Sequence, residues 1–202
     1  RVVLTMRRIL LSIILLFGLA ACAAESKWAS TEEVTRATYV HNGPPMISLF
    51  TVVGRNNGQG GHAALMINGS QRILFDPAGT WYHPQIPERN DVHFGISEPA
   101  VEFYIDYHAR ITWDVYRHDI IVSPAVAEKA IRLVQEYGAV PKAMCTQAVT
   151  AVLRQLPGFE SIGSTLFPVA AMKDFKALPG VTERFYQDDD PNDNDYILAP
   201  HV

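Results

Sequence analysis

The sequence contains very little cysteine, and its most apolar N-terminal segment is too short to cross a bilayer as a helix. Only two cysteines, Cys22 and Cys145, occur among the 202 residues. The apolar run at 9–19 is interrupted by Ser12 and Gly18, and a membrane-spanning helix needs about 20 apolar residues. A spanning helix is therefore excluded for this run, whose length instead suits the core of a signal peptide.

Charged residues are also scarce, and those present are mostly acidic. They make up 19% of the chain, whereas 48% is hydrophobic, which is enough for one compact domain with a core. Without residues 1–21, which carry Arg1, Arg7 and Arg8, 14 basic residues face 21 acidic ones, for a net charge of −7. An acidic protein repels phosphate backbones, so we expect no nucleic acid partner.

The N-terminal segment has the features of a lipoprotein export signal. Two arginines precede the apolar run, and "LAAC" at 19–22 follows it. Small residues before a cysteine are typical of the bacterial lipobox, where cleavage precedes the cysteine and the cysteine is acylated. We therefore predict a signal peptide at 1–21, a lipid on Cys22 and a membrane-anchored location in the cell envelope. Ala23 favours the periplasmic face of the outer membrane, and the alternative is a plain secretory signal with an incidental Cys22.

Beyond this leader, strand patterns precede helix patterns, which favours an α+β fold in a single domain. Strands are predicted at 44–53, 62–67, 71–76, 100–108 and 111–121, and helices at 124–137, 141–156 and 167–178. The Asn68-Gly69 pair predicts a β-hairpin between the second and third strands, and a second hairpin is predicted around Ala109-Arg110. Ser123 and Gly138 are the expected start and stop signals of the first helix.

The two ends of the mature chain are polar and are not expected to belong to the core. Residues 22–43 read as a tether from the membrane that ends in a short helical turn, 44–187 as the folded domain, and 188–202 as a loose acidic tail. The aspartates in that tail lack the glycine and the terminal glutamate of an EF-hand. We therefore predict neither a metal site nor a cofactor.

Cys145 is the residue best placed for chemistry, because it falls near the start of a predicted helix. A helix N-terminus stabilises an anion and lowers the pKa of a thiol, which favours a nucleophile. With Cys22 acylated, Cys145 has no partner for a disulfide, and a single thiol in an exported protein is a candidate nucleophile. The alternative is a core residue, since Cys145 shares an apolar helix face with Val149, Val152 and Leu156.

A nucleophilic thiol requires a base, and the hairpin offers one next to a carboxylate. His62 begins a strand after a glycine-rich loop, and Asp76 ends the next strand, so the turn can bring the two side chains together. Taken singly, His62 also fits an exposed loop position and Asp76 a turn cap before Pro77. Trp81 and Tyr82 follow and either wall a substrate groove or pack in the core. His83, His93, His108 and His118 have no comparable context.

These segments resemble a known group of enzymes. "GHAALMINGSQRILFDPAG" at 61–79 is similar to the histidine hairpin of papain-like amidases related to the NlpC-type cell-wall peptidases. "CTQAV" at 145–149 is similar to their nucleophile helix. The order of histidine, acid and cysteine matches the circularly permuted branch, which includes lecithin retinol acyltransferase-like enzymes and bacterial lipoproteins. The resemblance covers roughly residues 45–156.

This resemblance implies a permuted papain-like fold and a thiol hydrolase or acyltransferase without a cofactor. In that reading Cys145 is the nucleophile, His62 the base and Asp76 the orienting group. Many relatives place the third group one or two positions earlier, where this sequence has Leu74 and Phe75. The expected substrate is an amide or ester in the envelope, with a cell-wall peptide amide favoured over a lipid acyl group. A non-catalytic binding lipoprotein is the alternative of a different class.

Overall fold

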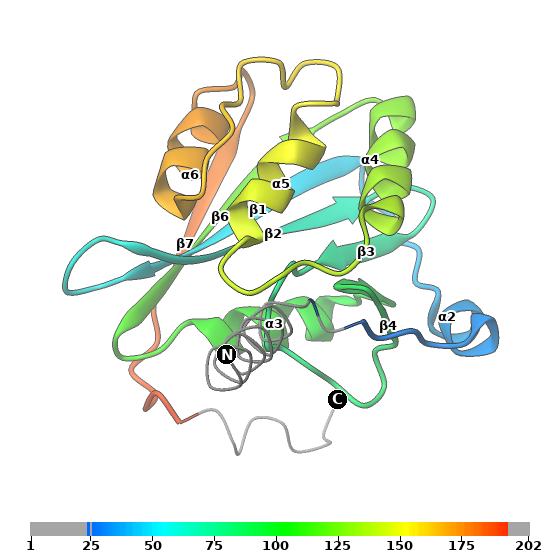
Figure 1. The fold of residues 1–202 in the computed structure, drawn as a ribbon, viewed down its shortest axis with the longest axis horizontal. Coiled ribbons are helices and arrows are strands. Elements are labelled where there is room, and N and C mark those ends of the chain that lie inside the picture. Colours follow the sequence, from blue (N-terminus) through cyan, green and yellow to red (C-terminus); the bar gives the residue numbers. More distant parts are fainter. Residues whose placement is uncertain (1–23, 25, 194–202) are drawn as a thin grey trace, which may run out of the picture.

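The protein folds around one antiparallel sheet with helices on both faces (Figure 1). A computed structural model describes residue 24 and residues 26–193, so the predicted signal peptide, Cys22 and the end of the tail at 194–202 lie outside the described residues. Within the described part, no helix has the length and apolar character needed to cross a membrane. The α+β prediction of an antiparallel sheet packed on helices is confirmed.

The sheet has seven strands in the order β4-β5-β3-β2-β1-β6-β7. The strands are β1 (Met46–Gly54), β2 (Gly60–Asn68), β3 (Arg72–Phe75), β4 (Glu88–Arg89), β5 (Val92–Phe94), β6 (Trp113–Ile121) and β7 (Thr182–Tyr186). The two longest pairings join β1 to β2 and β1 to β6. This arrangement buries β1 and most of β2 at the centre, which gives the site a rigid base.

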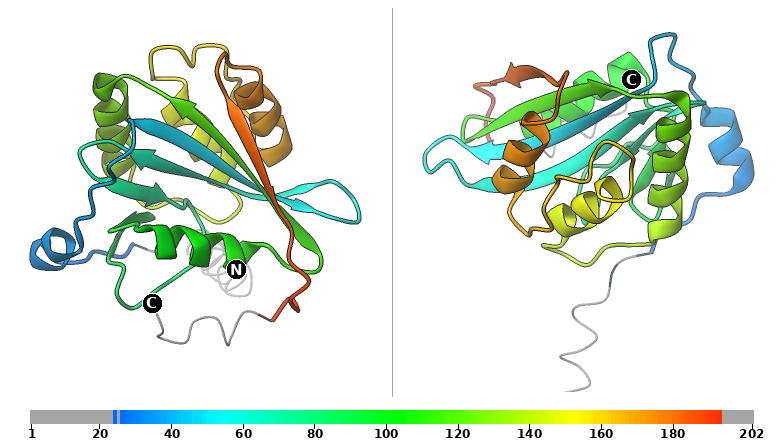
Figure 2. Two further views of the ribbon diagram at one scale, coloured as in Figure 1. Left: turned by 180° about the vertical axis from the view of Figure 1, so that it is seen from behind. Right: turned by 90° about the horizontal axis from the view of Figure 1, so that it is seen from above.

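Alternation along the central strands creates two separate cores. One face is covered by α4 (Pro124–Tyr137), α5 (Cys145–Leu153) and α6 (Pro168–Lys176), and the other by α3 (Glu98–His108), as Figure 2 shows. On β2, Ala63, Leu65 and Ile67 pack toward α5, whereas Ala64 and Met66 pack toward α3. The period of two thus directs neighbouring residues of one strand into different layers.

The predicted starts and ends of the first helix are confirmed at both termini. The Ser123 hydroxyl accepts a hydrogen bond from the Val126 N–H, Pro124 occupies the first turn, and Gly138 ends the helix at a φ of 86°. Glycine adopts that left-handed conformation without steric cost. The predicted helix at 167–178 is also present, as α6.

The strand predicted at 100–108, and with it the hairpin around Ala109-Arg110, is wrong. The segment is helix α3, whose Ser97 cap accepts a hydrogen bond from the Ala100 N–H and whose first turn holds a proline. Its buried residues, Ala100, Val101, Tyr104 and Ile105, recur at helical spacing. Alternating apolar letters in "VEFYIDYH" imitated the period of a strand, but burial follows the helical period.

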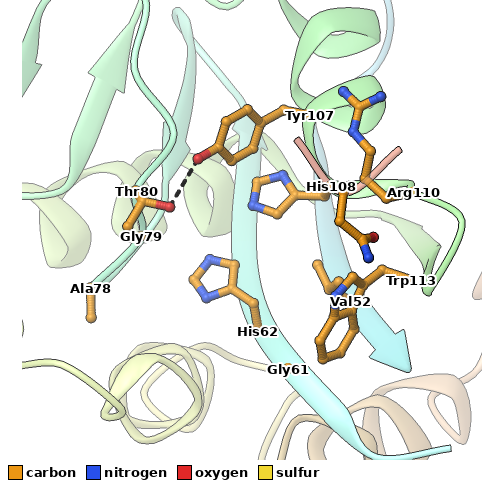
Figure 3. Close-up of a pocket in the computed structure, with 11 residues that line it drawn as sticks. Val52, Gly61, His62, Ala78, Gly79, Thr80, Tyr107, His108, Arg110 and Trp113 are labelled. Carbon is orange, nitrogen blue, oxygen red and sulfur yellow. Dashed lines mark hydrogen bonds between the residues drawn. The ribbon is translucent and has the colours of Figure 1, made fainter. Parts of the chain in front are cut away.

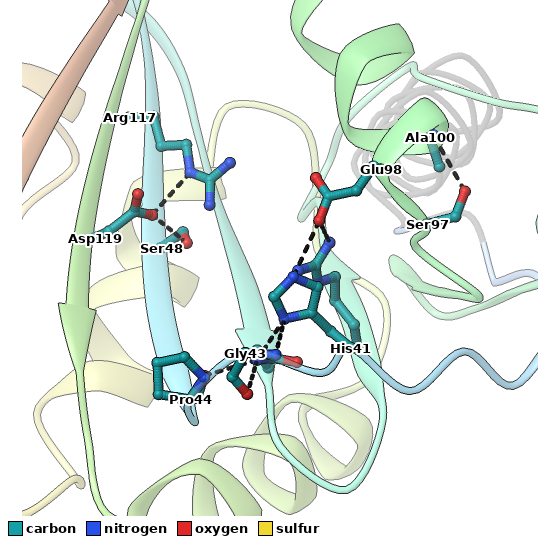
Figure 4. Close-up of polar contacts among 11 residues, drawn as sticks. His41, Gly43, Pro44, Ser48, Ser97, Glu98, Ala100, Arg117 and Asp119 are labelled. Carbon is teal, nitrogen blue, oxygen red and sulfur yellow. Dashed lines mark hydrogen bonds and ion pairs between the residues drawn. The ribbon is translucent and has the colours of Figure 1, made fainter.

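The polar segments at the two ends pack on the domain in their described parts. α2 (Thr31–Ala37) supplies the expected helical turn, but the residues around it are hydrogen-bonded to strands β4 and β3, through Ala29 N–H to Glu88 O and Arg72 N–H to Tyr39 O. His41 pairs with Glu98 at 3.1 Å (Figure 4). At the other end, 182–186 forms edge strand β7, which the sequence analysis did not predict.

The hairpin predicted between the second and third strands is present, with its turn one position later than the predicted strands at 62–67 and 71–76 leave for it. Asn68 is still paired with Arg72, so residues 69–71 form a three-residue connection. The Asn68 side chain is buried and donates a hydrogen bond to Pro44 O at 2.7 Å. The register pairs Leu65 with Phe75, which extends to Asp76 opposite Ala64, on the same strand face as His62.

Candidate active site

Cys145 is the first residue of α5, at a sharp turn from the preceding loop. The helix predicted from 141 is therefore shorter at its start, and residues 141–144 form a turn. Ala143 has a φ of 66°, which is unusual for a residue with a side chain. Met144 provides no side-chain cap, so the first N–H groups of the helix are left to other partners. The free thiol is 7% exposed.

His62 and Asp76 form the tightest polar contact in this region. The His62 Nε2 atom lies 2.6 Å from Asp76 Oδ1, and the Asp76 side chain is 0% exposed. Burial would lower the pKa of His62, but the charge of Asp76, with the hydrogen bonds that His62 makes to Asp76 and Cys145, raises it to about 10. Burial would likewise raise the pKa of Asp76, and the charge of His62 brings it well below its usual value.

Cys145 interacts with the same histidine ring. Because Nε2 faces Asp76, Nδ1 is the nitrogen available to the thiol. Burial raises the pKa of Cys145, but a hydrogen bond and charge from His62, the Thr146 hydroxyl and the Ala63 N–H lower it below its usual value. The thiol, imidazole and carboxylate thus form one continuous chain, in which a thiolate and an imidazolium stabilise each other.

Helix α3 adds two residues that the sequence analysis did not assign to the site. The Tyr104 hydroxyl donates a hydrogen bond to Asp76 Oδ1 at 2.8 Å. Burial and the Asp76 charge raise the pKa of Tyr104 well above its usual value, so this hydroxyl remains a donor. The His108 ring is stacked on His62 with a centroid separation of 5.6 Å and an angle of 6°. The signal was Ser97 before Glu98-Pro99, a helix start that places Tyr104 and His108 one turn apart.

His108 is held in a state opposite to that of His62. Its Nδ1 atom lies 2.8 Å from the Tyr104 carbonyl oxygen, which fixes Nδ1 as the protonated nitrogen. Burial lowers its pKa to about 4, because the attraction of Asp76 does not outweigh desolvation and the charge of His62. The site therefore pairs a charged imidazole with a neutral one whose Nε2 is an acceptor.

A pocket of about 350 Å³ opens beside the two histidines (Figure 3). Its walls include Thr80 and Tyr107, whose hydroxyls lie 3.0 Å apart, and the indole of Trp113. A Cβ atom at Gly61 would collide with the Trp113 ring, so the glycine before His62 lets the indole lie against the strand. The volume falls in the usual range for small-ligand sites.

Asp91 connects the loops on both sides of the site. Asn90 and Asp91 form a two-residue turn with positive φ between β4 and β5, a conformation these residue types tolerate. The Asp91 carboxylate accepts hydrogen bonds from Val140 N–H at 2.8 Å and Ala78 N–H at 3.3 Å. Its carbonyl oxygen accepts from the Asp76 N–H at 2.8 Å.

The remaining candidates from the sequence lie away from this pocket. Trp81, for which both a groove wall and a core position were predicted as alternatives, is 1% exposed and packs against Tyr104 and His93, so it belongs to the core. Tyr82 is exposed but lines a different cavity with Trp28. His83 and His93 are buried among aromatic rings, and His118 pairs with Glu183.

The described part of the acidic tail is also held in place. Arg55 pairs with Asp114 at 2.6 Å and reaches Asp189, while Arg110 pairs with Asp106 and Asp190. Arginine side chains thus engage these carboxylates. Residues 188–193 form part of the surface next to the pocket, to which Asn192 contributes.

Comparisons with known proteins identify no relative. No family model matches the chain, and neither a curated protein nor a solved structure is significantly similar to it.

Proposed function

We propose that the protein is a thiol hydrolase or acyltransferase that acts on an amide or ester. The observation that carries this proposal is the continuous chain of Cys145, His62 and Asp76, in which the thiol pKa is lowered and the imidazole pKa is raised. A core cysteine has no need of a charged neighbour. The three residues come from separate elements, α5, β2 and the end of β3, and the resemblance to permuted papain-like enzymes supports the same roles for them.

Acylation follows from the charges of the resting site. The Cys145 thiolate attacks the substrate carbonyl carbon, and the carbonyl π electrons move to oxygen. The Cys145 N–H, at the start of α5, is the natural first donor to that oxyanion. As the tetrahedral intermediate collapses, His62 gives its proton to the leaving nitrogen or oxygen. Asp76, held by Tyr104, keeps the imidazole oriented throughout.

Deacylation uses the same imidazole in the opposite direction. Neutral His62 takes a proton from water, and the resulting hydroxide equivalent attacks the acyl carbon. The intermediate expels the Cys145 thiolate and releases a carboxylic acid, restoring the imidazolium. An alcohol or amine acceptor in place of water would give acyl transfer by the same steps.

The pocket favours a peptide amide over a lipid acyl chain as substrate. Polar side chains of Thr80, Tyr107 and Asn192 line it beside the indole of Trp113. Peptide groups need such donors and acceptors, whereas a long acyl chain needs a continuous apolar channel. If the protein is anchored in the envelope, as the "LAAC" motif indicates, the peptides within its reach are those of the cell wall.

Covalent labelling tests the proposed nucleophile directly. A peptidyl vinyl sulfone should label the wild-type protein at Cys145, as identified by mass spectrometry, and His62→Ala should label far more slowly. Cys145→Ser should not label, and His83→Ala, which removes a buried histidine away from the pocket, should label at the wild-type rate. Equal labelling of folded wild type and His62→Ala would leave only a non-catalytic binding protein.

Anchoring by a lipid on Cys22 is a separate proposal, supported by the "LAAC" motif after an apolar run. Cys22→Ser expressed with its leader should move from the membrane fraction to the soluble periplasmic fraction. An unchanged membrane association of this variant would refute the lipid anchor without affecting the proposed chemistry.

A further inference from the structure

The pocket brings together three side chains with the ligand types that zinc prefers. His62, Asp76 and His108 each offer one ligand atom, and all three atoms lie within 4.8 Å of one another. Two imidazoles and one carboxylate form a common ligand set of catalytic zinc sites, where a fourth position stays open to water. The three residues come from β2, the end of β3 and the end of α3, so no sequence motif reveals the set.

Two of the three side chains are already oriented as metal ligands usually are. Metal-bound histidines commonly donate their other ring N–H to a backbone carbonyl, which leaves a bare nitrogen for the ion. His108 makes that contact through Nδ1 to Tyr104 O, and its ring lines the pocket. Ligand carboxylates are also hydrogen-bonded as a rule, and the Tyr104 hydroxyl does this for Asp76.

The carboxylate has an unused atom as well. Asp76 Oδ2 is buried and has no hydrogen-bond partner among the described residues. A buried, unpaired carboxylate oxygen is costly unless something binds it. A Cβ at Gly79 would collide with this oxygen, so the loop after β3 provides the space in which Oδ2 sits.

The separations require only small adjustments. Ligand atoms around tetrahedral zinc lie roughly 3.3 Å apart, given bonds of about 2.0–2.1 Å. The observed limit of 4.8 Å and the 2.6 Å between His62 Nε2 and Asp76 Oδ1 lie on either side of that value. The open pocket beside His62 and His108 gives the ion and its water a path in (Figure 3).

We propose that His62, Asp76 and His108 form a binding site for Zn²⁺ that switches the thiol chemistry off. Zinc takes the Nε2 lone pair of His62 and replaces the proton that it shares with Asp76, and this proton is released to solvent. His62 keeps its Nδ1 proton, but with zinc on Nε2 that proton can leave only by forming an anionic imidazolate, so His62 no longer serves as the acid in the cycle described above. The inhibitory consequence rests on the proposed function, whereas the binding site does not.

Metal binding is measured first, on folded protein freed of metal by a chelator that is then removed. Zn²⁺ binding is followed by calorimetry, and Co²⁺ serves as a spectroscopic substitute. Wild type and Cys145→Ser should both bind one ion, and the Co²⁺ complex should lack a sulfur-to-cobalt charge-transfer band. His108→Ala should weaken binding by about 100-fold or more, beyond the effect of removing an outer-shell partner. His41→Ala, which removes a histidine paired with another carboxylate, should bind as wild type does.

Two results overturn the site. One is equal affinity of His108→Ala and wild type for the ion. The other is loss of binding in Cys145→Ser together with a sulfur-to-cobalt charge-transfer band in wild type, which would place the ion on the thiol. Vinyl sulfone labelling then tests the consequence: Zn²⁺ should slow labelling of wild type and leave His108→Ala much less affected. Labelling that proceeds equally fast with the site filled would overturn the inhibitory role. Metal binding without any labelling of metal-free protein would instead refute the proposed function and leave the zinc site standing.

Discussion

Two histidines of this protein meet a carboxylate at almost the same distance, yet their protonation differs. His62 lies 2.6 Å from Asp76, and His118 lies 2.7 Å from Glu183. The pKa of His62 rises to about 10, whereas burial lowers the pKa of His118 despite the hydrogen bond and charge of Glu183. A short contact with an acid therefore does not by itself charge a histidine.

The difference lies in what else the carboxylate binds. Glu183 is 35% exposed and also pairs with Lys176 at 2.8 Å, so solvent and a second cation share its charge. Asp76 is fully buried, and its hydrogen-bonding partners are His62 and the neutral hydroxyl of Tyr104. A buried carboxylate that pairs with no second cation raises the pKa of its histidine much more than an exposed carboxylate that also pairs with a lysine. The thiol on the other side of His62 adds to this effect, and His118 has no such neighbour.

The largest expected effect comes from removing each histidine in turn. His62→Asn should lower the vinyl sulfone labelling rate at pH 7 by on the order of 10³-fold, because the thiolate loses its charged partner. His118→Asn should leave the rate unchanged, since its carboxylate contact does not reach the thiol. Rates are compared at equal folded concentration in the presence of a chelator. Similar losses in both variants would mean that general destabilisation, and not the charge chain, controls the thiol.

Acid stability separates the third histidine from these two. The pKa of His108 is about 4 in the folded protein and about 6.5 in an unfolded chain. The unfolded state therefore binds more protons between these values, so the contribution of His108 is present above pH 6.5 and is lost as the pH falls toward 4. Each pKa unit corresponds to about 1.4 kcal/mol, so the loss amounts to at most about 3.5 kcal/mol.

Urea unfolding at pH 7 and at pH 4.5 measures this loss. His108→Asn should show a smaller drop in unfolding free energy between the two values than wild type does, with a chelator present throughout. His41→Ala is the control, because it removes a partly exposed histidine outside the stacked pair. An equal drop in His108→Asn and wild type would show that other groups cause the acid sensitivity.

Neutralising Asp76 and Glu183 in turn tests whether only the buried carboxylate controls the thiol chemistry. Asp76→Asn should reduce labelling at pH 7 by about 30-fold, close to 2 kcal/mol, and should lower the pKa of His62 from about 10. In wild type, acyl transfer falls as the pH rises through that value, because the proton for the leaving group is lost. The falling limb should therefore move to lower pH in Asp76→Asn. Glu183→Gln should leave both the rate and the limb in place, and a shifted limb in that variant would contradict the comparison.

The smallest expected effect concerns the hydroxyl that supports Asp76. Tyr104→Phe removes one hydrogen bond to Oδ1 and should cost about 1 kcal/mol, or roughly fivefold in labelling rate. Because Tyr104 acts through Asp76, the variant should change the position of the His62 titration as well as the rate. A rate change with an unmoved titration would assign Tyr104 a packing role in the core of α3.

The contact between His62 and Asp76 could be predicted from the sequence, but its geometry could not. Residue types at the two strand ends were sufficient to place the pair at one end of a hairpin. The predicted strands at 62–67 and 71–76 left Asn68 in the turn, yet Asn68 is a strand residue whose side-chain amide donates a hydrogen bond to Pro44 O. Tertiary hydrogen bonding outweighed local turn preference, and the resulting register puts Asp76 on the face of His62.

The site residues on α3 could not be predicted from the alternation of apolar residues. In "VEFYIDYH" the apolar residues fit both the strand period of two and the helical period. A strand prediction does not place Tyr104 and His108 next to each other, whereas a helix places them one turn apart. The short strands β4 and β5 were missed for another reason, since two- and three-residue strands have too few side chains to show a period. Four of the five residues of edge strand β7 are exposed, and the strand lacks the apolar alternation that a half-buried strand shows.

The double contact of Asp91 has a consequence for how precisely the chemistry is aligned. The loop that follows Asp76 and the loop that leads to Cys145 both hydrogen-bond to one oxygen of this carboxylate. Both loops are therefore positioned relative to the same carboxylate oxygen, so the distance between them does not depend on two separate attachment points. A breathing motion that moves Asp91 carries the two loops in the same direction. The spacing between acid and nucleophile is thus insulated from movements of the sheet edge on which Asp91 sits.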